Sequence, residues 1–424
     1  MKRSVVLWFC AMCGAAVGAP AVRAEDPPQM GRAVLRPSIA RVAPRASVSF
    51  KVVMEPQRLR TARVAEGASW SVNGVPGGNA EFGSIDARGT YRAPAKPPSP
   101  PEVHIQAEVP GAENQYVWGT VLIGGREPVY RLEKSWGEDA QEGEHLGGLT
   151  GIALDSNNTL VIADSKRSQV FRFARDGRFL HTIGRGPDNA RISFAEPRDV
   201  AIDRHGRVFV SDDSTGPPRI RVFGPEGDYL FGFAQKGAGP GRIFRTGGMA
   251  FSPDGRFFVV DIDNMRVSIF SESGEFLAMW DQEGRRVGRL NAPYGLAIDP
   301  NGDVFIVGYY GPCQKFSKEG DFLLAFAHPD PPDGPVGFQS ATGDRWGNVY
   351  LATRGEGESP GDFDPKRGKT ITVMKFNNAG DYITEFRLPS GELGETRMAV
   401  DEEDRLYVVF NRKDRVGVEV YREH

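Results

Sequence analysis

The chain has 424 residues, of which 40% are hydrophobic and 25% charged, so it is long enough for two or more domains and too apolar to be disordered. Its 52 glycines and 31 prolines favour an all-β protein with many tight turns over a helical one. A formal net charge of −3 argues against nucleic acid or an anionic membrane surface as the partner.

Residues 1–24 are predicted to be a secretion signal. A basic head is followed by the apolar stretch Val5–Val17, and small residues at Val22 and Ala24 suit cleavage after Ala24. The alternative is a retained anchor, but this stretch is short for a membrane span and no later one is apolar enough. The protein is therefore expected to be exported to the periplasm, cell surface or exterior, with a mature net charge of 49 − 55 = −6.

Residues 25–125 are predicted to form a β-sandwich. Segments such as Val48–Val52 and Val103–Ala107 alternate in polarity, and about seven short strands fit into about 100 residues. Trp70–Gly74 and Gly89–Pro94 resemble segments of bacterial Ig-like domains, which implies an Ig-like sandwich without the antibody disulfide. Gly124–Pro128 is expected to be the domain boundary.

The rest of the chain repeats one phrase: apolar, Ala, apolar, Asp, a short turn that usually contains Gly, and an apolar run. The fourth residue of the phrase recurs at Asp155, Asp203, Ser252, Asp299, Asp344 and Asp401. These positions are 48, 49, 47, 45 and 57 residues apart, which indicates a structural repeat.

A second phrase completes each of the first five repeats: an apolar strand, a tight turn ending in Gly, and another apolar strand. Gly177, Gly227 and Gly274 are examples. Each repeat therefore holds four antiparallel strands, a to d, and cannot bury both faces alone. Six such units around an axis bury them, so we predict a six-bladed β-propeller over residues 129–424; the rival is one long sandwich.

The ends of the predicted ring complement each other. The last repeat ends at Val418–Tyr421 without a strand d, while Val129–Gly137 reads like a strand d placed before the first repeat. We therefore predict that Val129–Gly137 pairs with the last blade and closes the ring.

The repeats resemble the NHL family. The likeness lies in Ile152–Asp155, in Val161–Asp164 and Val210–Asp212 on strand b, and in Val170–Phe173 on strand c. It implies an NHL-like six-bladed propeller. It implies no particular activity, because this scaffold serves enzymes and binding proteins alike.

Strand order assigns two sides to the predicted ring. The a–b and c–d connections are tight turns on one side, and the b–c and d–a connections are long and varied on the other. The d–a loops run over about 185–198, 234–247, 281–294 and 327–339, and one b–c loop spans Arg354–Lys369. Long varied loops on a rigid ring are where recognition is usually built.

Candidate binding residues border the inner strands on that loop side. They are Arg198, Arg245, Tyr294, Gln339 and Arg397, together with Asp164, Asp212 and Asp261 at the ends of strands b. For the three aspartates the alternative is structural, since a carboxylate beside a loop can accept backbone N–H bonds. The aspartates of the repeated phrase are expected to form turns.

Signals for catalysis are weak. Only His145 and His328 are placed to approach the loop side, so no metal site is predicted. Gly355–Asp364 could offer oxygen ligands to calcium, but lacks regular spacing. Asp199 and Asn291 are available to a lactonase-type channel, although no motif singles them out.

No nucleophile signature is present. Cys313 is left alone once the signal is removed, which excludes an intramolecular disulfide, and it takes a core position on strand c. The sequence thus favours a non-catalytic binding protein for a protein, peptide or glycan, without a cofactor. The alternative is a metal-dependent lyase or lactonase-type hydrolase acting in the channel.

Overall fold

The computed structural model describes most of the chain beyond the secretion signal. The described residues are 31–55, 63–125, 127–137, 146–184, 192–213, 216, 218–281, 288–327, 337–353, 371–388, 396–412 and 415–424. Within them the chain forms strands and turns but no helix, so the described part has no helix that could cross a membrane. The all-β prediction is confirmed.

Twelve short strands make up the region that we call the N-terminal unit. They are β1 (Arg32–Arg36), β2 (Ile39–Val42), β3 (Ser47–Ser49), β4 (Lys51–Glu55), β5 (Arg63–Val64), β6 (Ser69–Val72), β7 (Val75–Pro76), β8 (Gly78–Asn79), β9 (Gly83–Ile85), β10 (Thr90–Arg92), β11 (Glu102–Glu108) and β12 (Tyr116–Ile123). They form three sheets, in the orders β1-β4-β5, β3-β10-β9-β8 and β2-β12-β11-β6-β7. Their buried side chains, among them Phe50, Tyr91 and Ile105, share one core.

The N-terminal unit has more strands than the expected seven. Gly74, Gly77, Gly78 and Gly83 all have positive φ, and the turns they allow divide this stretch into two- and three-residue strands. β2 also pairs parallel to β12, a pairing that alternation in polarity could not reveal.

In the part of the chain that the structure describes, six four-stranded sheets follow, built from β13 to β38. Their strands are β13 (Tyr130–Trp136), β14 (Leu149–Leu154), β15 (Leu160–Asp164), β16 (Gln169–Phe173), β17 (Phe179–Ile183), β18 (Pro197–Ile202), β19 (Val208–Asp212), β20 (Ile220–Phe223), β21 (Tyr229–Phe233), β24 (Thr246–Phe251), β25 (Phe257–Asp261), β26 (Arg266–Phe270), β27 (Phe276–Trp280), β28 (Pro293–Ile298), β29 (Val304–Gly308), β30 (Cys313–Phe316), β31 (Phe322–Phe326), β32 (Phe338–Gly343), β33 (Val349–Thr353), β34 (Thr372–Phe376), β35 (Tyr382–Arg387), β36 (Met398–Val400), β37 (Leu406–Asn411) and β38 (Val416–Glu423). A small parallel pair, β22 (Gln235–Lys236) and β23 (Arg242–Ile243), lies between two of these sheets.

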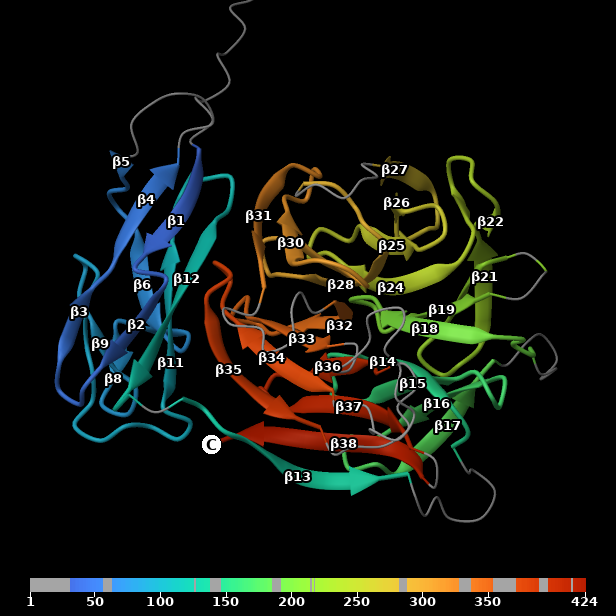
Figure 1. Cartoon of the computed structure of the whole chain (residues 1–424), viewed down its shortest axis with the longest axis horizontal. Coiled ribbons are helices and arrows are strands. Elements are labelled where there is room, and N and C mark those ends of the chain that lie inside the picture. The colour runs from blue at the N-terminus through green and yellow to red at the C-terminus, as the bar shows by residue number, and fades with distance from the viewer. Residues whose placement is uncertain are drawn as a thin grey trace, which may run out of the picture.

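These sheets surround a common centre, which defines a β-propeller (Figure 1). The innermost strands are β14, β18, β24, β28, β32 and β36, and five sheets run outward in chain order. The buried apolar side chains of the propeller form separate clusters between neighbouring sheets rather than one central core. Cys313 is one of these core residues and is fully buried, as expected.

The aspartates of the repeated phrase form the a–b turns. The Asp203 carboxylate accepts hydrogen bonds from the backbone N–H of His205 (2.9 Å) and Arg207 (2.8 Å), and Gly206 has φ of 75°. The same pattern recurs at Asp155, Asp299, Asp344 and Asp401. This turn-forming role explains the repeated phrase.

The predicted ring closure is observed. β13 pairs antiparallel with β38, from Tyr130 opposite Glu423 to Trp136 opposite Val418. The sheet order is β13-β38-β37-β36, so the first strand of the propeller completes the sheet made by its last three.

The N-terminal unit packs against the tight turns of two sheets, β28–β31 and β32–β35, beside which it lies in Figure 1. Asn301 and Tyr116 exchange hydrogen bonds through the Asn301 amide and the Tyr116 backbone, and Arg32 forms an ion pair with Asp303. His104 stacks on Trp346 with ring centroids 4.9 Å apart. The unit therefore sits on the turn side, the side that carries the a–b and c–d turns.

A buried ionic cluster joins the N-terminal unit to the propeller: Glu102, Lys375, Glu423, Tyr130 and Tyr350. The ammonium of Lys375 lies 2.8 Å from a carboxylate oxygen of Glu102 and 2.8 Å from one of Glu423. The hydroxyl of Tyr130 donates to Glu423 at 2.7 Å and lies 3.0 Å from that of Tyr350. All five side chains are buried, so their charges are poorly screened.

Two carboxyl groups share one cation in this cluster. Burial, and then the neighbouring Glu423, hold the pKa of Glu102 well above its ordinary value. Although burial opposes it, Lys375 lowers the pKa of Glu423. The ionised form is therefore favoured at Glu423, which pairs with Lys375, and disfavoured at Glu102.

Candidate functional site

A pocket of about 260 Å³ runs along the centre of the propeller. All six inner strands line it, from Asp199, Gly248, Gly295, Ser340 and Arg397 at the loop end to Leu154, Ile202, Phe251, Ile298, Gly343 and Val400 at the turn end. Asp199 and Arg397 are the charged residues among the described residues that line it.

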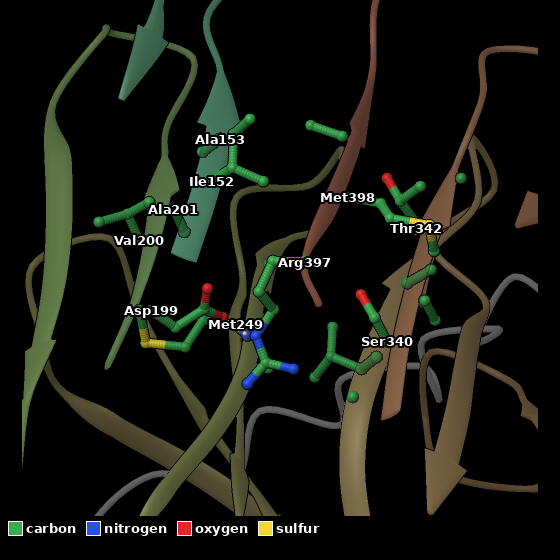
Figure 2. A pocket seen from close by; sticks show the side chains of 18 of the residues that line it. Ile152, Ala153, Asp199, Val200, Ala201, Met249, Ser340, Thr342, Arg397 and Met398 are labelled. Atoms are coloured by element: carbon green, nitrogen blue, oxygen red, sulfur yellow. Dashed lines mark hydrogen bonds between the residues drawn. The ribbon is translucent and has the colours of Figure 1, made fainter. Parts of the chain in front are cut away.

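Arg397 crosses the loop end of this channel. Its guanidinium donates to the carbonyl oxygens of Thr150 (3.2 Å) and Gln339 (2.9 Å) and lies 4.9 Å from the centre of the Tyr294 ring. It thus connects the sheet of β36 to three others. Figure 2 shows the side chain extending into the pocket, with Asp199 and Ser340 on either side of it in that view.

Asp199 is also fixed in the channel wall. One of its carboxylate oxygens accepts the backbone N–H of Met249 at 2.9 Å, and its own N–H donates to the Ser211 hydroxyl. Asn291, which the sequence offered as its companion, is not among the residues that line this pocket. Of that candidate pair, only Asp199 lies in the channel.

Tyr294 and Gln339 are buried and point away from solvent. Tyr294 is 1% exposed and packs against Tyr309 with ring centroids 4.5 Å apart. The Gln339 amide donates to the carbonyl oxygen of Thr353 at 3.1 Å. Both support the inner strands around Arg397. Tyr294 and Arg397 border the inner strands as the repeat predicts, and both side chains are buried between neighbouring sheets.

Arg198 and Arg245 lie on the loop side, where the b–c and d–a connections are. Arg198 is 3.0 Å from Glu196 and 3.5 Å from Asp213, and its side chain is 15% exposed. Arg245 is 43% exposed and pairs with Asp263 at 2.7 Å. Of the five bordering residues named from the sequence, Arg245 is the most open to a partner.

Asp164, Asp212 and Asp261 all fix loops. Asp164 accepts the backbone N–H groups of Gly147 and Gly148, and Asp212 accepts that of Glu196. These contacts match the structural alternative for the three aspartates.

Asp261 positions an exposed patch that sequence reasoning missed. It accepts the backbone N–H of Phe244 (2.9 Å) and Arg245 (3.3 Å). Phe244 is 41% exposed, and the Lys236 ammonium lies 4.9 Å from the centre of its ring. Met265, also exposed, projects from the next connection. We call Lys236, Phe244, Arg245 and Met265 the loop-side patch.

The loop that carries this patch is tightly held. Buried Arg266 donates to the carbonyl oxygens of Ala238 (2.6 Å), Gly239 (3.1 Å) and Arg242 (2.6 Å). Asn264 adds a bond to the Gly237 carbonyl at 3.0 Å. The only sequence signal for the patch was Phe244 beside Arg245 in a long d–a loop.

Several other predicted features fall outside the described residues. They are the secretion signal, His145, His328 and the possible calcium segment Gly355–Asp364. In the described part of the chain, no group of three or more His, Cys, Asp or Glu side chains could hold a metal ion.

The fold thus defines a β-propeller protein with an N-terminal β-sheet unit. No protein-family model and no curated protein matches the chain. Similar solved structures include a virginiamycin B lyase from Staphylococcus aureus (12% identity, 70% of this chain and 88% of that chain, TM-score 0.45). A gluconolactonase from Xanthomonas campestris has 15% identity over 71% of this chain and 96% of that chain, with a TM-score of 0.47.

A third similar structure extends over nearly the whole chain. It is a protein of unknown function from Bacteroides thetaiotaomicron VPI-5482, with 15% identity over 94% of this chain and 99% of that chain and a TM-score of 0.48. All three TM-scores lie below 0.5, so these likenesses assign no function to this chain.

Proposed function

We propose that this protein is an exported recognition protein that binds a protein, peptide or glycan through the loop side of its propeller. In this proposal residues 1–24 are a secretion signal, 25–125 an Ig-like sandwich and 129–424 a six-bladed NHL-like propeller. The repeated phrase and the six four-stranded sheets support the blade count. Export would place the protein in the periplasm, on the cell surface or outside the cell.

One observation carries the choice of side. The N-terminal unit occupies turn-side positions on two sheets, whereas the loop-side patch remains exposed on a loop that buried Arg266 holds in place. An aromatic ring, a thioether and two cations on a rigid support resemble the composition of binding hot spots. A pre-organised surface also loses little entropy when it binds.

Replacing Phe244 and Arg245 together by Ala should weaken partner binding at least about tenfold, a loss equivalent to about 1.4 kcal/mol. Binding of the mature chain to peptide and glycan arrays would identify partners, and titration would give Kd for each variant. The matched control replaces Leu277 and Arg204 by Ala. Both side chains are exposed, and both line one groove on the turn side of the propeller. If only the control variant loses binding, the proposed side is wrong.

The second candidate function is a metal-dependent lyase or lactonase-type hydrolase. Asp199 and Arg397 favour it, because a carboxylate and a guanidinium inside a channel could act on a small substrate. We expect elemental analysis of purified mature protein to give zinc well below one equivalent, since the histidines do not converge in the sequence. One tightly held transition metal per chain would contradict this expectation and favour the enzyme. Calcium measured in the same sample tests the segment Gly355–Asp364.

A further inference from the structure

We infer that the propeller channel is a second binding site, closed at the loop end and open on the turn side, for a small uncharged molecule with a hydroxyl-bearing head and an apolar tail. This inference concerns another ligand and the opposite side of the ring from the loop-side patch. It therefore goes beyond the proposed function and can fail without affecting it.

Exposure along the channel shows which end is open. At the loop end Asp199 is 6% exposed, Ser340 2% and Arg397 5%. At the turn end the side chains are half-buried: Leu154, Ile202, Phe251, Ile298 and Val400. Solvent therefore reaches the channel past this apolar rim.

A second cavity continues the channel outward on the turn side. Its volume is about 300 Å³, and it shares Phe251 and Ile298 with the channel. Beyond these two residues it is lined by residues of the turns, some uncharged (Ser252, Pro253, Gly255, Pro300) and some charged (Arg204, Glu272, Asp299, Asp344). The two cavities meet at the rim and together form a path from the turn-side surface to Arg397.

The closed end offers polar contacts without a net charge. The lining holds one cation, Arg397, and one anion, Asp199, so its formal charges sum to zero. A charged head would lose its hydration on entering and would find no excess of opposite charge in return. The Ser340 and Thr342 hydroxyls make no hydrogen bond with other described residues, and both line the pocket, as Figure 2 shows. Hydroxyl groups on a ligand suit this set, because they both donate and accept.

The dimensions limit the ligand to a small molecule. A volume of 260 Å³ lies just below the range of about 300–1,000 Å³ typical of ligand pockets. A hydroxyl-bearing head at Ser340 leaves an apolar tail at the rim of Leu154, Ile298 and Val400, where apolar contact removes its surface from water.

Hexane-1,2-diol is a suitable probe, with hexanoate and propane-1,2-diol as comparisons. Ligand-detected NMR on the mature full-length chain should show hexane-1,2-diol binding more tightly than either of them. Ser340→Ala should weaken its binding roughly fivefold by removing one hydrogen bond. No binding of hexane-1,2-diol, or equal binding of hexanoate, would overturn the inference.

Two tryptophan substitutions distinguish the ends of the channel. Ile298→Trp should block the turn-side rim and abolish binding, whereas Tyr310→Trp, at a 50% exposed residue in a loop-side connection, should leave it unchanged. Circular dichroism and melting confirm folding. If Ile298→Trp does not fold, the Ser340→Ala result still decides whether the channel binds the diol. Loss of binding in Tyr310→Trp alone would place the opening on the loop side.

Discussion

Replacing Lys375 by Met should lower the free energy of unfolding of the mature chain by about 3–5 kcal/mol. The substitution keeps a side chain of similar length in a site that is 3% exposed, so the change tests charge rather than volume. Without the ammonium, Glu423 becomes a buried carboxylate with no cation beside it, although the Tyr130 hydroxyl and the Glu102 carboxyl still contact it. Denaturant unfolding followed by tryptophan fluorescence measures the loss.

A double variant separates charge from packing. Lys375→Met combined with Glu423→Gln leaves no unpaired charge in the cluster, and should recover much of the stability that Lys375→Met loses. Equal stability of the native chain and the Lys375→Met variant would show that the cluster does not depend on its cation.

Glu102→Gln is the matched control for Lys375→Met, because it changes the other end of the same contact without removing the cation. The same variant tests how stability depends on pH. Burial raises the pKa of Glu102 above its unfolded value of about 4.3, so the folded state holds a proton that the unfolded state releases. Stability from this group is complete below about pH 4.3 and falls as pH rises toward the folded pKa, on the order of 1.4 kcal/mol per pH unit. Glutamine mimics the protonated form, so the variant should match the native chain at acidic pH and exceed it as pH rises.

Burial also raises the pKa of Asp344 to about 7. The contribution of this group to the free energy of unfolding therefore also falls as pH rises. Asp344 is present in both chains and shares Lys375 with Glu102, so the difference between Glu102→Gln and native removes the part of its contribution that is independent of Glu102. If that difference stayed constant with pH, Glu102 would be ionised in the folded protein.

Local chemistry explains why so much of the propeller could be predicted. In five of the six a–b turns an aspartate accepts two backbone N–H bonds, and in the described turns at Asp203, Asp299 and Asp344 a glycine with positive φ follows three residues later, so the repeat is visible in the sequence. The missing strand d was also visible, because Val129–Gly137 had no repeat of its own to complete.

Long-range contacts explain what could not be predicted. Glu102 lies 273 positions before Lys375, and their ion pair exists only because the N-terminal unit packs on the turns of the propeller. Nothing in the sequence near Glu102 distinguishes it from an exposed strand residue. The N-terminal unit is thus joined to the propeller by a buried ion pair.

The sequence placed the candidate residues along the chain but could not show how far each is exposed. Arg397 does lie beside an inner strand, as the repeat indicates. Its burial depends on Thr150, Gln339 and Tyr294, which come from three other sheets. The loop-side patch was missed for a similar reason, because Lys236 and Phe244 are brought together by a loop that Arg266 organises.

Removing β13 should destabilise the propeller more than removing the N-terminal unit alone. Two shortened chains test this, one starting at Glu127 and one at Leu146. Both lack the N-terminal unit and lose Glu102, so they differ only in residues 127–145, which hold β13, the three residues before it and the nine after it.

The closing strand β13 pairs with β38 and packs against the sheets on either side of its own. Tyr130 reaches Glu423 on β38 and packs against Phe386 of the preceding sheet with ring centroids 4.9 Å apart. Trp136 packs against Phe173 of the following sheet at 5.1 Å. Without β13, strand β38 becomes an open edge and these aromatic contacts are lost, which invites aggregation.

Loss of a buried aromatic side chain costs about 3–5 kcal/mol, and about 1 kcal/mol lowers Tm by about 2–4 °C in a domain of this size. The chain starting at Leu146 should therefore melt at least about 5 °C lower than the chain starting at Glu127, or aggregate first. Scanning calorimetry measures Tm, and light scattering detects aggregation. Because β13 would supply the outer strand of its sheet, equal melting of the two chains would mean that the ring closes by contacts between the inner strands alone.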